Sequence, residues 1–180
     1  WSMVVDLPPK PTMLAILAVF WVLNTLGVSL VARSQALMVF ILLAVCGVLV
    51  VSAVPAGRAA NFTPFLSHGW TGVMVAIPLM VSLFLGIETA TEVGEEVRDG
   101  RRTIPLGIAL SIVLTSAVYL LVAVAALSVL GADELGGSKA PLLDMANATL
   151  GRMGQPLILV SVTVAIGTSL NAISLIFSRF

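Results

Sequence analysis

The polar residues of this chain are gathered into a few short stretches that separate long apolar segments. A helix needs roughly 20 mostly apolar residues to cross the ~30 Å hydrocarbon core of a bilayer. Apolar residues occupy nearly every helical face of these segments, as expected where lipid or other helices surround a helix. The alternating pattern of transmembrane strands is absent. The pattern therefore predicts about five transmembrane helices, at 13–32, 36–54, 72–96, 104–130 and 156–177.

The predicted connectors differ in length and charge. Residues 32–35 (ARSQ) would form a tight turn, whereas residues 131–155 form a long connector rich in glycine and other small residues. The connector at 97–103 is short and holds three arginines. Because arginine-rich short loops favour the cytoplasmic side of a membrane, we expect the loop 97–103 to be cytoplasmic.

Composition agrees with a membrane protein and excludes several classes of function. Hydrophobic residues make up 59% of the 180 residues and charged residues 10%, and the mean hydropathy is +1.12. A net charge of zero gives no reason to expect a nucleic acid partner. One cysteine and one histidine exclude a disulfide framework within the chain and a metal site rich in cysteine or histidine. We expect an integral, multi-pass protein of the plasma (inner) membrane, and a piece of a longer polytopic chain.

The third apolar segment is interrupted by a carboxylate. Residues 72–87 read GVMVAIPLMVSLFLGI, and Glu88 follows directly. At 1.5 Å per residue, Glu88 would lie roughly 24 Å along a helix begun at Gly72, still within the hydrocarbon zone. A carboxylate there is expected to face a cavity or a proton path, and burial favours its protonated form. We therefore expect Glu88 to load and release a proton; the alternative is a neutral glutamate that caps a helix kink.

The residues around Glu88 suggest a break in this helix. Pro78 removes a backbone donor, and Gly86 adds flexibility just before Glu88. Non-helical backbone survives at membrane depth only where protein or a wet cavity satisfies its polar groups. A break at residues 82–87 would therefore imply a binding site. The later glutamates, Glu92, Glu95 and Glu96, are better explained as a solvated helix end balanced by arginines.

The segment FLGIETATEVGEEVRDGRRTIPLGIALS resembles the sixth and seventh helices of amino acid–polyamine–organocation (APC) superfamily permeases. It carries, in the family's order, Phe84, Gly86, Glu88, Glu95, Glu96, Arg102, Ile104 and Pro105. Asp99-Gly100 stands where the family usually has Asn-Pro, and both pairs form turns. VLNTLGVSLVARSQ resembles the junction of the fourth and fifth helices, and AIGTSLNAISLIFSRF resembles the eighth. The chain thus looks like helices four to eight of a usual twelve.

The resemblance implies an all-α inverted-repeat (5+5) transporter fold, with the third helix of this chain discontinuous and substrate bound near the midplane. It implies that carbonyls of the unwound stretch hold the substrate ammonium and that nearby side chains face the substrate. The substrate-binding residues implied are Ser82, Leu83, Phe84, Leu85 and Gly86. Glu88 matches a carboxylate linked to proton sensing in acid-resistance exchangers of the family.

Three residues match eighth-helix positions that hold sodium in sodium-coupled relatives. They are Ala165, Thr168 and Ser169. A carbonyl and two hydroxyls suit a hard cation, although the first helix of the fold would have to complete the shell. Equally, both hydroxyls can bond to backbone and serve only for helix packing. The coupling ion, H⁺ or Na⁺, is left open. No other cofactor and no dedicated metal site is expected.

Three classes of function were weighed. Secondary transport of amino acids or related amines by alternating access is favoured, as symport or exchange. A membrane enzyme is disfavoured because the chain has one histidine, in a loop, and no aspartate inside a predicted helix. A non-transporting scaffold subunit is the alternative, and a continuous third helix would favour it. The identity of the substrate and the oligomeric state are left open, and the expected partners are a small-molecule substrate, an amino acid or amine, and the lipid bilayer.

Overall fold

The computed structural model describes residues 28–63, 69–84 and 99–177, together with residues 11, 14, 15, 18, 22 and 97. This part of the chain is almost entirely helical and holds no strand. Its elements in chain order are α2 (Val28–Ala56), η1 (Ala59–Phe62), α3 (Gly69–Ser82), α4 (Gly100–Gly137), α5 (Pro141–Leu150), η4 (Gly151–Met153) and α6 (Gly154–Phe177). The all-α fold class predicted from the sequence is confirmed.

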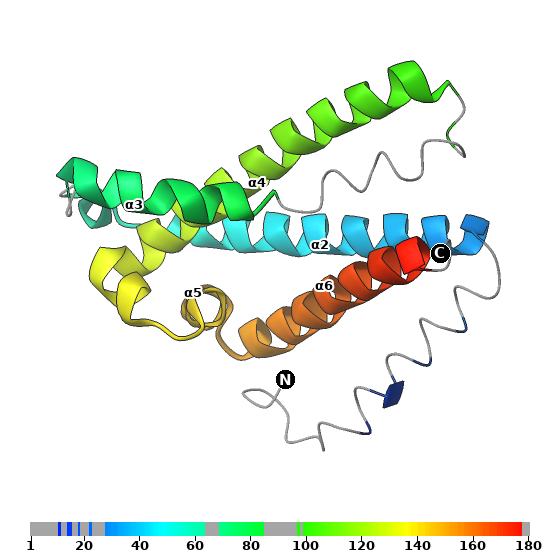
Figure 1. Cartoon of the computed structure of the whole chain (residues 1–180). Coiled ribbons are helices and arrows are strands. Elements are labelled where there is room, and N and C mark those ends of the chain that lie inside the picture. Colours follow the sequence, from blue (N-terminus) through cyan, green and yellow to red (C-terminus); the bar gives the residue numbers. More distant parts are fainter. Residues whose placement is uncertain are drawn as a thin grey trace.

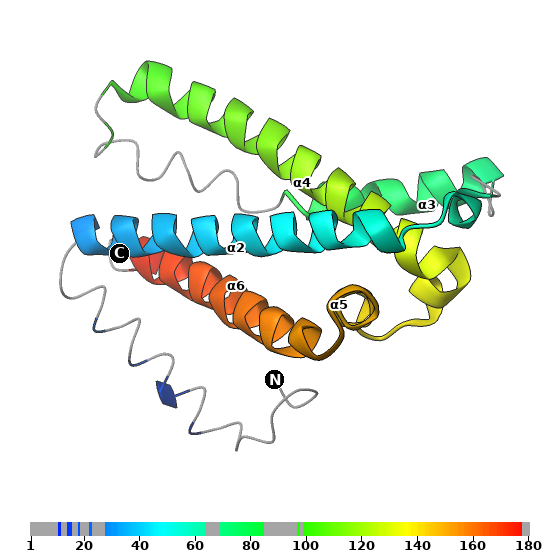
Figure 2. The same cartoon turned by 180° about the vertical axis from the view of Figure 1, so that it is seen from behind.

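The helix α2 is the axis of the arrangement. It runs straight through the middle of the molecule, and α6 lies beside it in both views (Figures 1 and 2). The helix α4 crosses α2 near one end and diverges from it toward Gly100 (Figure 1). Three stretches of the described chain are long and apolar enough to cross a membrane: Leu30–Ala56, Gly100–Gly137 and Pro141–Ala172.

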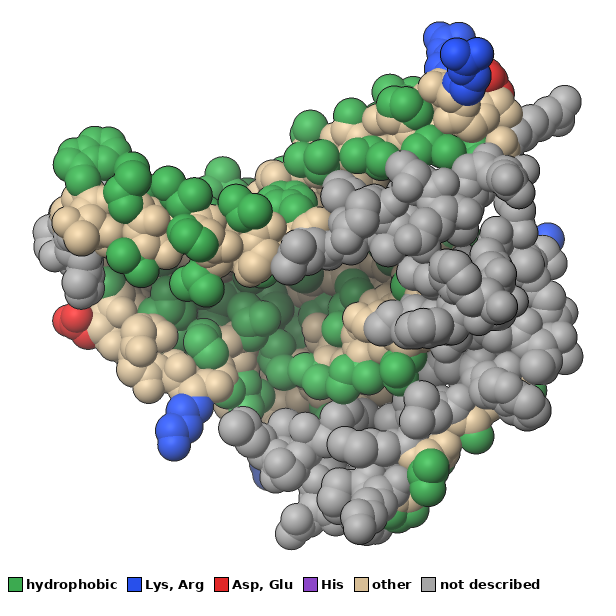
Figure 3. Space-filling view, viewed as in Figure 1, with side chains coloured by type: hydrophobic (Ala, Val, Ile, Leu, Met, Phe, Trp, Pro, Cys, Tyr) green, Lys and Arg blue, Asp and Glu red, His purple; other side chains and the backbone are tan. Residues whose placement is uncertain are grey.

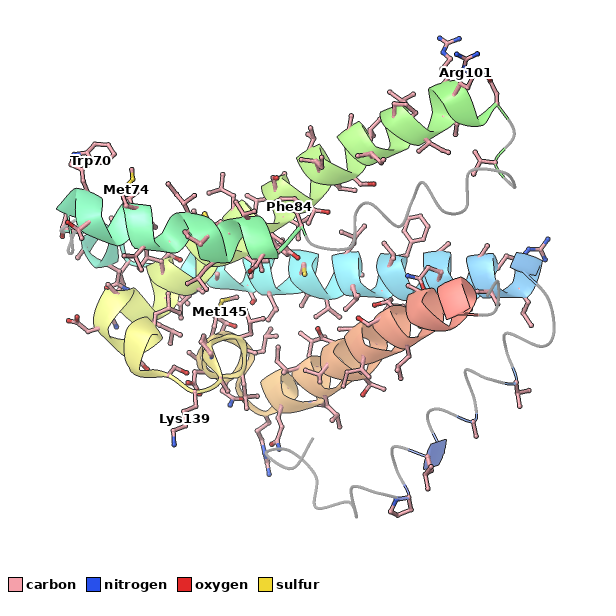
Figure 4. All side chains as sticks on the ribbon, viewed as in Figure 1. Trp70, Met74, Phe84, Arg101, Lys139 and Met145 are labelled. Carbon is pink, nitrogen blue, oxygen red and sulfur yellow. The ribbon has the colours of Figure 1, made fainter. Side chains whose placement is uncertain are left out.

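The buried core lies where α2, α4, α5 and α6 meet, near Met145 in Figure 4. Met145 and Ala146 of α5 have no exposed surface, and Leu49 of α2 is 2% exposed. Many of the other members are alanine, whose small side chain lets the helices approach closely. The core comprises Val45, Leu49, Ala53, Ala125, Ala126, Leu130, Met145, Ala146 and Ile158.

Outside this core, the described surface is largely apolar. Large side chains such as Phe40, Val54 and Leu120 are 65–77% exposed, which in water would be an aggregation hazard but suits lipid or further helices. On the face shown in Figure 3, the charged side chains of the described residues lie toward the ends of the molecule. Arg101 and Lys139 lie at opposite ends (Figure 4). Which end is cytoplasmic stays a prediction.

The tight turn predicted at residues 32–35 is wrong. Those residues lie inside α2, which begins at Val28 and continues to Ala56. The physical reason is that the stretch holds no glycine or proline, and Ala, Arg and Gln are good helix formers. The Ser34 hydroxyl donates to the Val31 carbonyl at 2.8 Å, a bond made within a continuous helix. A polar tripeptide therefore marks an end of the membrane region here without breaking the helix.

The long connector predicted at residues 131–155 is also not a simple loop. Gly131 breaks α4 with φ 77° and ψ 167°, a conformation that glycine adopts readily. A regular helix would pair the Ser128 carbonyl with the N–H four residues on. Instead this carbonyl accepts bonds from the Arg58 N–H and from Asn61 Nδ2, both at 2.8 Å. The break in α4 thus anchors the chain that follows α2.

The same connector contains α5, which the sequence prediction missed. Its start has helix signals, with Pro141 in the first turn and Asp144 beside the helix N-terminus. The Ser138 hydroxyl donates to the Asp144 carboxylate and accepts from the Ala140 N–H. Only ten residues long, α5 is stable because its face with Met145 is buried, so its formation depends on distant helices.

Candidate functional site

The helix α3 ends inside the segment predicted as the third span. Its last helical residue is Ser82, and Leu83 and Phe84 form a turn. The Leu83 N–H donates to the Met80 carbonyl at 3.2 Å and the Phe84 N–H to the Val81 carbonyl at 3.1 Å. Both bonds join residues three apart, which is how the last turn of a helix tightens as it ends.

The length of α3 can be compared with the thickness of a membrane. Its 14 residues span roughly 21 Å at 1.5 Å per residue, about two thirds of the ~30 Å hydrocarbon core. Phe84 lies midway along the molecule, between Trp70 at one end and Arg101 at the other (Figure 4). The helix α3, from Gly69 to Ser82, is therefore shorter than a complete membrane span.

The backbone carbonyls near this end are already partly used. The Ser82 hydroxyl donates to the Leu79 carbonyl at 2.6 Å, and the carbonyls of Met80 and Val81 accept the two turn bonds. A carbonyl available to a substrate ammonium must therefore come from Ser82 or a later residue. Ser82 and Leu83 are exposed and Phe84 is half-buried, so the first three predicted substrate residues lie on an open helix end.

The rest of the predicted substrate and proton site lies outside the described residues. This applies to Leu85 and Gly86, to Glu88, and to the later glutamates of the same stretch. Their roles stay predictions. The described chain resumes at residue 97, and Asp99 has left-handed backbone, with φ 57° and ψ 48°, directly before α4 begins at Gly100.

The structure brings the three predicted cation-site residues together on α6. The hydroxyls of Thr168 and Ser169 both donate to the Ala165 carbonyl, at 2.8 and 3.2 Å. Three oxygens thus converge on one helix face, on which Ala165 and Ser169 are exposed and Thr168 is half-buried. In this arrangement both hydroxyl protons point at the same carbonyl. A cation would need them to turn away and leave their lone pairs free.

The described helices do not bring the end of α3 into contact with the predicted cation-site residues of α6. The helix α3 makes no extensive contact with another described element, whereas α6 packs on α2 and α5. No group of three or more His, Cys, Asp or Glu residues capable of holding a metal occurs in the described part of the chain.

A buried polar contact between α2 and α6 was missed from the sequence. Asn171 is 1% exposed, and its Nδ2 donates to the Gln35 Oε1 at 2.9 Å and to the Val31 carbonyl at 3.3 Å. Its Oδ1 is buried and has no hydrogen-bond partner. The signal available in the sequence was a polar side chain inside an apolar span. The sequence analysis considered only the hydroxyls of Thr168 and Ser169 in this helix. Asn171 also lines a hollow of about 500 Å³ beside α2.

A second polar contact joins α2 to α5 at the other end of the molecule. The Ser52 hydroxyl donates to the Thr149 Oγ1 at 3.1 Å and also lies 2.9 Å from the Leu49 carbonyl. The Thr149 hydroxyl lies 3.0 Å from the Met145 carbonyl of its own helix. Because the bond between Ser52 and Thr149 joins residues 97 apart in sequence, it fixes α5 on α2 in a way that sequence spacing could not reveal.

Comparison with protein families identifies the family of this chain. The family described as amino acid permease matches residues 10–180, nearly the whole chain. The chain belongs to the amino acid permease family. The resemblance to APC superfamily permeases is therefore confirmed, and this permease chain is an integral, multi-pass membrane protein.

Curated relatives agree with this assignment. Proteins named as uncharacterized transporters in Mycobacterium bovis and Mycobacterium tuberculosis are 39% identical over 113 residues, which is 63% of this chain and 26% of theirs. An uncharacterized transporter of Rhizobium meliloti is 29% identical over 141 residues, 76% of this chain and 30% of its own. The permease chain thus spans between a quarter and a third of these relatives. No solved structure matches it significantly.

Proposed function

We propose that the protein is a secondary transporter of amino acids or related amines that works by alternating access, with no covalent step. The observation that supports this proposal is the end of α3 at Ser82, after only 14 residues, in a member of the amino acid permease family. A helix that stops there leaves peptide groups of the following residues to be satisfied by protein, water or substrate. A scaffold subunit gives no reason for such an end.

The roles follow from the chemistry of this helix end. Carbonyls from Ser82 onward hold the substrate ammonium, and the side chains of Leu83 and Phe84 meet the substrate side chain. Glu88, a few residues further on, carries the coupling proton. The test is uptake of a panel of radiolabelled amino acids and amines into proteoliposomes that contain the full-length protein. Failure of every substrate to exchange across the membrane contradicts the proposal.

We expect Glu88→Gln to flatten the pH dependence of uptake, because glutamine keeps the size of the side chain and cannot load a proton. The measurement is the initial uptake rate from about pH 5 to about pH 8, the range in which a coupling group must change its proton. Glu134→Gln is the matched control, since Glu134 is exposed at the far end of α4. An unchanged pH profile in Glu88→Gln rules out the proton role.

We expect Thr168→Val and Ser169→Ala each to raise the sodium concentration for half-maximal uptake by about tenfold, the effect of losing roughly 1.4 kcal/mol of binding. Thr163→Val is the control, because the Thr163 hydroxyl also donates to a carbonyl of α6, that of Leu159, at 2.7 Å. The measurement is uptake against sodium concentration at constant ionic strength. Equal rates after replacement of sodium by choline would remove the cation role and leave the proton as coupling ion.

A further inference from the structure

A groove between α2 and α4 is independent of the proposed transport site. It has a volume of about 370 Å³ and lies where α2 ends and the chain turns into η1. Its lining includes the small residues Ala53, Gly57, Ala125 and Ser128. Gly57 is required there, because a methyl group at this position would lie 2.9 Å from the Ser128 hydroxyl oxygen. Small residues on both helices therefore keep the groove open.

The larger residues along the groove are apolar and accessible. Val54 of α2 is 77% exposed, and Leu121 and Val124 of α4 are 54% and 44% exposed. Phe62 of η1 also lines the groove. A groove with these side chains favours hydrocarbon over water.

The polar groups that border the groove are already paired. The Ser128 hydroxyl donates to the Ala125 carbonyl, and the Gly57 N–H donates to the Ala53 carbonyl, both at 2.8 Å. The Ser128 carbonyl accepts from the Arg58 N–H and from Asn61 Nδ2. An occupant therefore needs to supply no hydrogen bonds along the groove, which fits an acyl chain and not a polar solute.

The charge at the groove is the guanidinium of Arg58. Arg58 lines the groove at the end of α2 and is exposed, and within the described part of the chain its side chain has no ion pair. A guanidinium beside an apolar groove at the edge of the membrane complements a phosphate joined to a hydrocarbon chain. We propose that this groove binds an anionic phospholipid, with one acyl chain against α2 and α4 and the headgroup phosphate on Arg58.

The charge contribution can be removed without disturbing the fold. The structural bond of Arg58 to Ser128 is made by its backbone N–H, so Arg58→Gln keeps it. Arg152→Gln is the matched control, because Arg152 is an exposed arginine that lies in η4 and does not line the groove. For the apolar part, Val54→Phe fills the groove. Val51→Phe is its control, since Val51 is 70% exposed on the same helix and does not line the groove.

The experiment is native mass spectrometry of the purified full-length protein with added phosphatidylglycerol or phosphatidylcholine of identical acyl chains. We expect about fivefold tighter retention of phosphatidylglycerol, the effect of one arginine near a membrane surface. Arg58→Gln should abolish this preference and Arg152→Gln should keep it. Val54→Phe should weaken the retention of both lipids, and Val51→Phe should change the retention of neither.

Three results would overturn the lipid site. Equal retention of the two lipids would show that Arg58 gives no preference for an anionic headgroup. If Arg58→Gln and Arg152→Gln lose the preference for phosphatidylglycerol equally, the lipid is attracted by the overall positive charge and not by a site at Arg58. Unchanged binding in Val54→Phe would show that the acyl chain lies elsewhere. None of these results depends on transport activity, so the site and the proposed function can fail separately.

Discussion

Replacing Gly154 by alanine is expected to destabilise the protein by about 3 kcal/mol or more, at or beyond the upper end of the usual cost of overpacking a core. A methyl group at Gly154 would lie 2.5 Å from both the carbonyl carbon and the carbonyl oxygen of Ala146, and 2.7 Å from the Asn147 nitrogen. These are backbone atoms of α5, so no side-chain rotation relieves the clash. Ala146 is itself fully buried, and α5 has no free space to move into.

The glycine is needed for space and not for backbone conformation. Gly154 has helical angles, with φ −61° and ψ −47°, which alanine adopts without strain. Gly107→Ala is the matched control, because a methyl group there, inside α4, meets nothing within 4 Å. The control should be neutral or stabilising by up to about 1 kcal/mol. Thermal unfolding of both purified variants measures the difference, and equal stability would mean that α5 and α6 can separate easily.

The sequence could predict that helices form but not which faces they bury. In a soluble helix the apolar stripe marks the core, whereas here lipid-facing and helix-facing positions are both apolar. Leu49 is 2% exposed, while Val48 and Val51 on the same helix are 45% and 70% exposed. Nothing in the local pattern separates these three residues. Burial is decided by α4 and α5, which come much later in the chain.

Helix boundaries could be predicted where proline or glycine interrupts a helix, and they were missed where neither residue does so. The predicted end at residue 130 agrees with the break at Gly131, and α3 ends inside the interrupted segment. The turn at residues 32–35 was inferred from polarity alone, and polarity at a membrane surface does not stop a helix. The helix α5 was missed because its ten residues are too few for a membrane span and its stability comes from tertiary contacts.

In the candidate site, too, the sequence indicated which residues to consider, but it did not show their partners. The resemblance implied roles for Ser82, Phe84 and Glu88, and the two of these that the structure describes, Ser82 and Phe84, lie at the end of α3. The hydroxyls of Thr168 and Ser169 could be chosen from their positions, yet only the structure shows that both donate to Ala165. The role of Asn171 is visible only from its hydrogen bond to a distant residue, Gln35. Pairs separated by 136 residues leave no local signal in one sequence.

Asn171→Asp is expected to destabilise the protein by about 3 kcal/mol or more, the range for a buried charge without a partner. The Asn171 Nδ2 donates to two oxygens, those of Gln35 and Val31, and aspartate replaces this donor by an acceptor. An ionised carboxylate would face both oxygens without compensation. A protonated one would restore a single donor, and only after paying for proton uptake.

Asn171→Leu separates the effect of shape from the effect of polarity. Leucine loses both donated bonds but also removes Oδ1, the buried oxygen that lacks a partner in the structure. A bond between membrane helices contributes on average about 0.6 kcal/mol, and an unsatisfied buried acceptor costs about 1–3 kcal/mol. The two terms nearly cancel, so Asn171→Leu should unfold within a few degrees of the original protein and far above Asn171→Asp. If the aspartate variant is as stable as the leucine variant, then Oδ1 has a donor in the assembled protein, and the α2–α6 contact is wetter than these helices show.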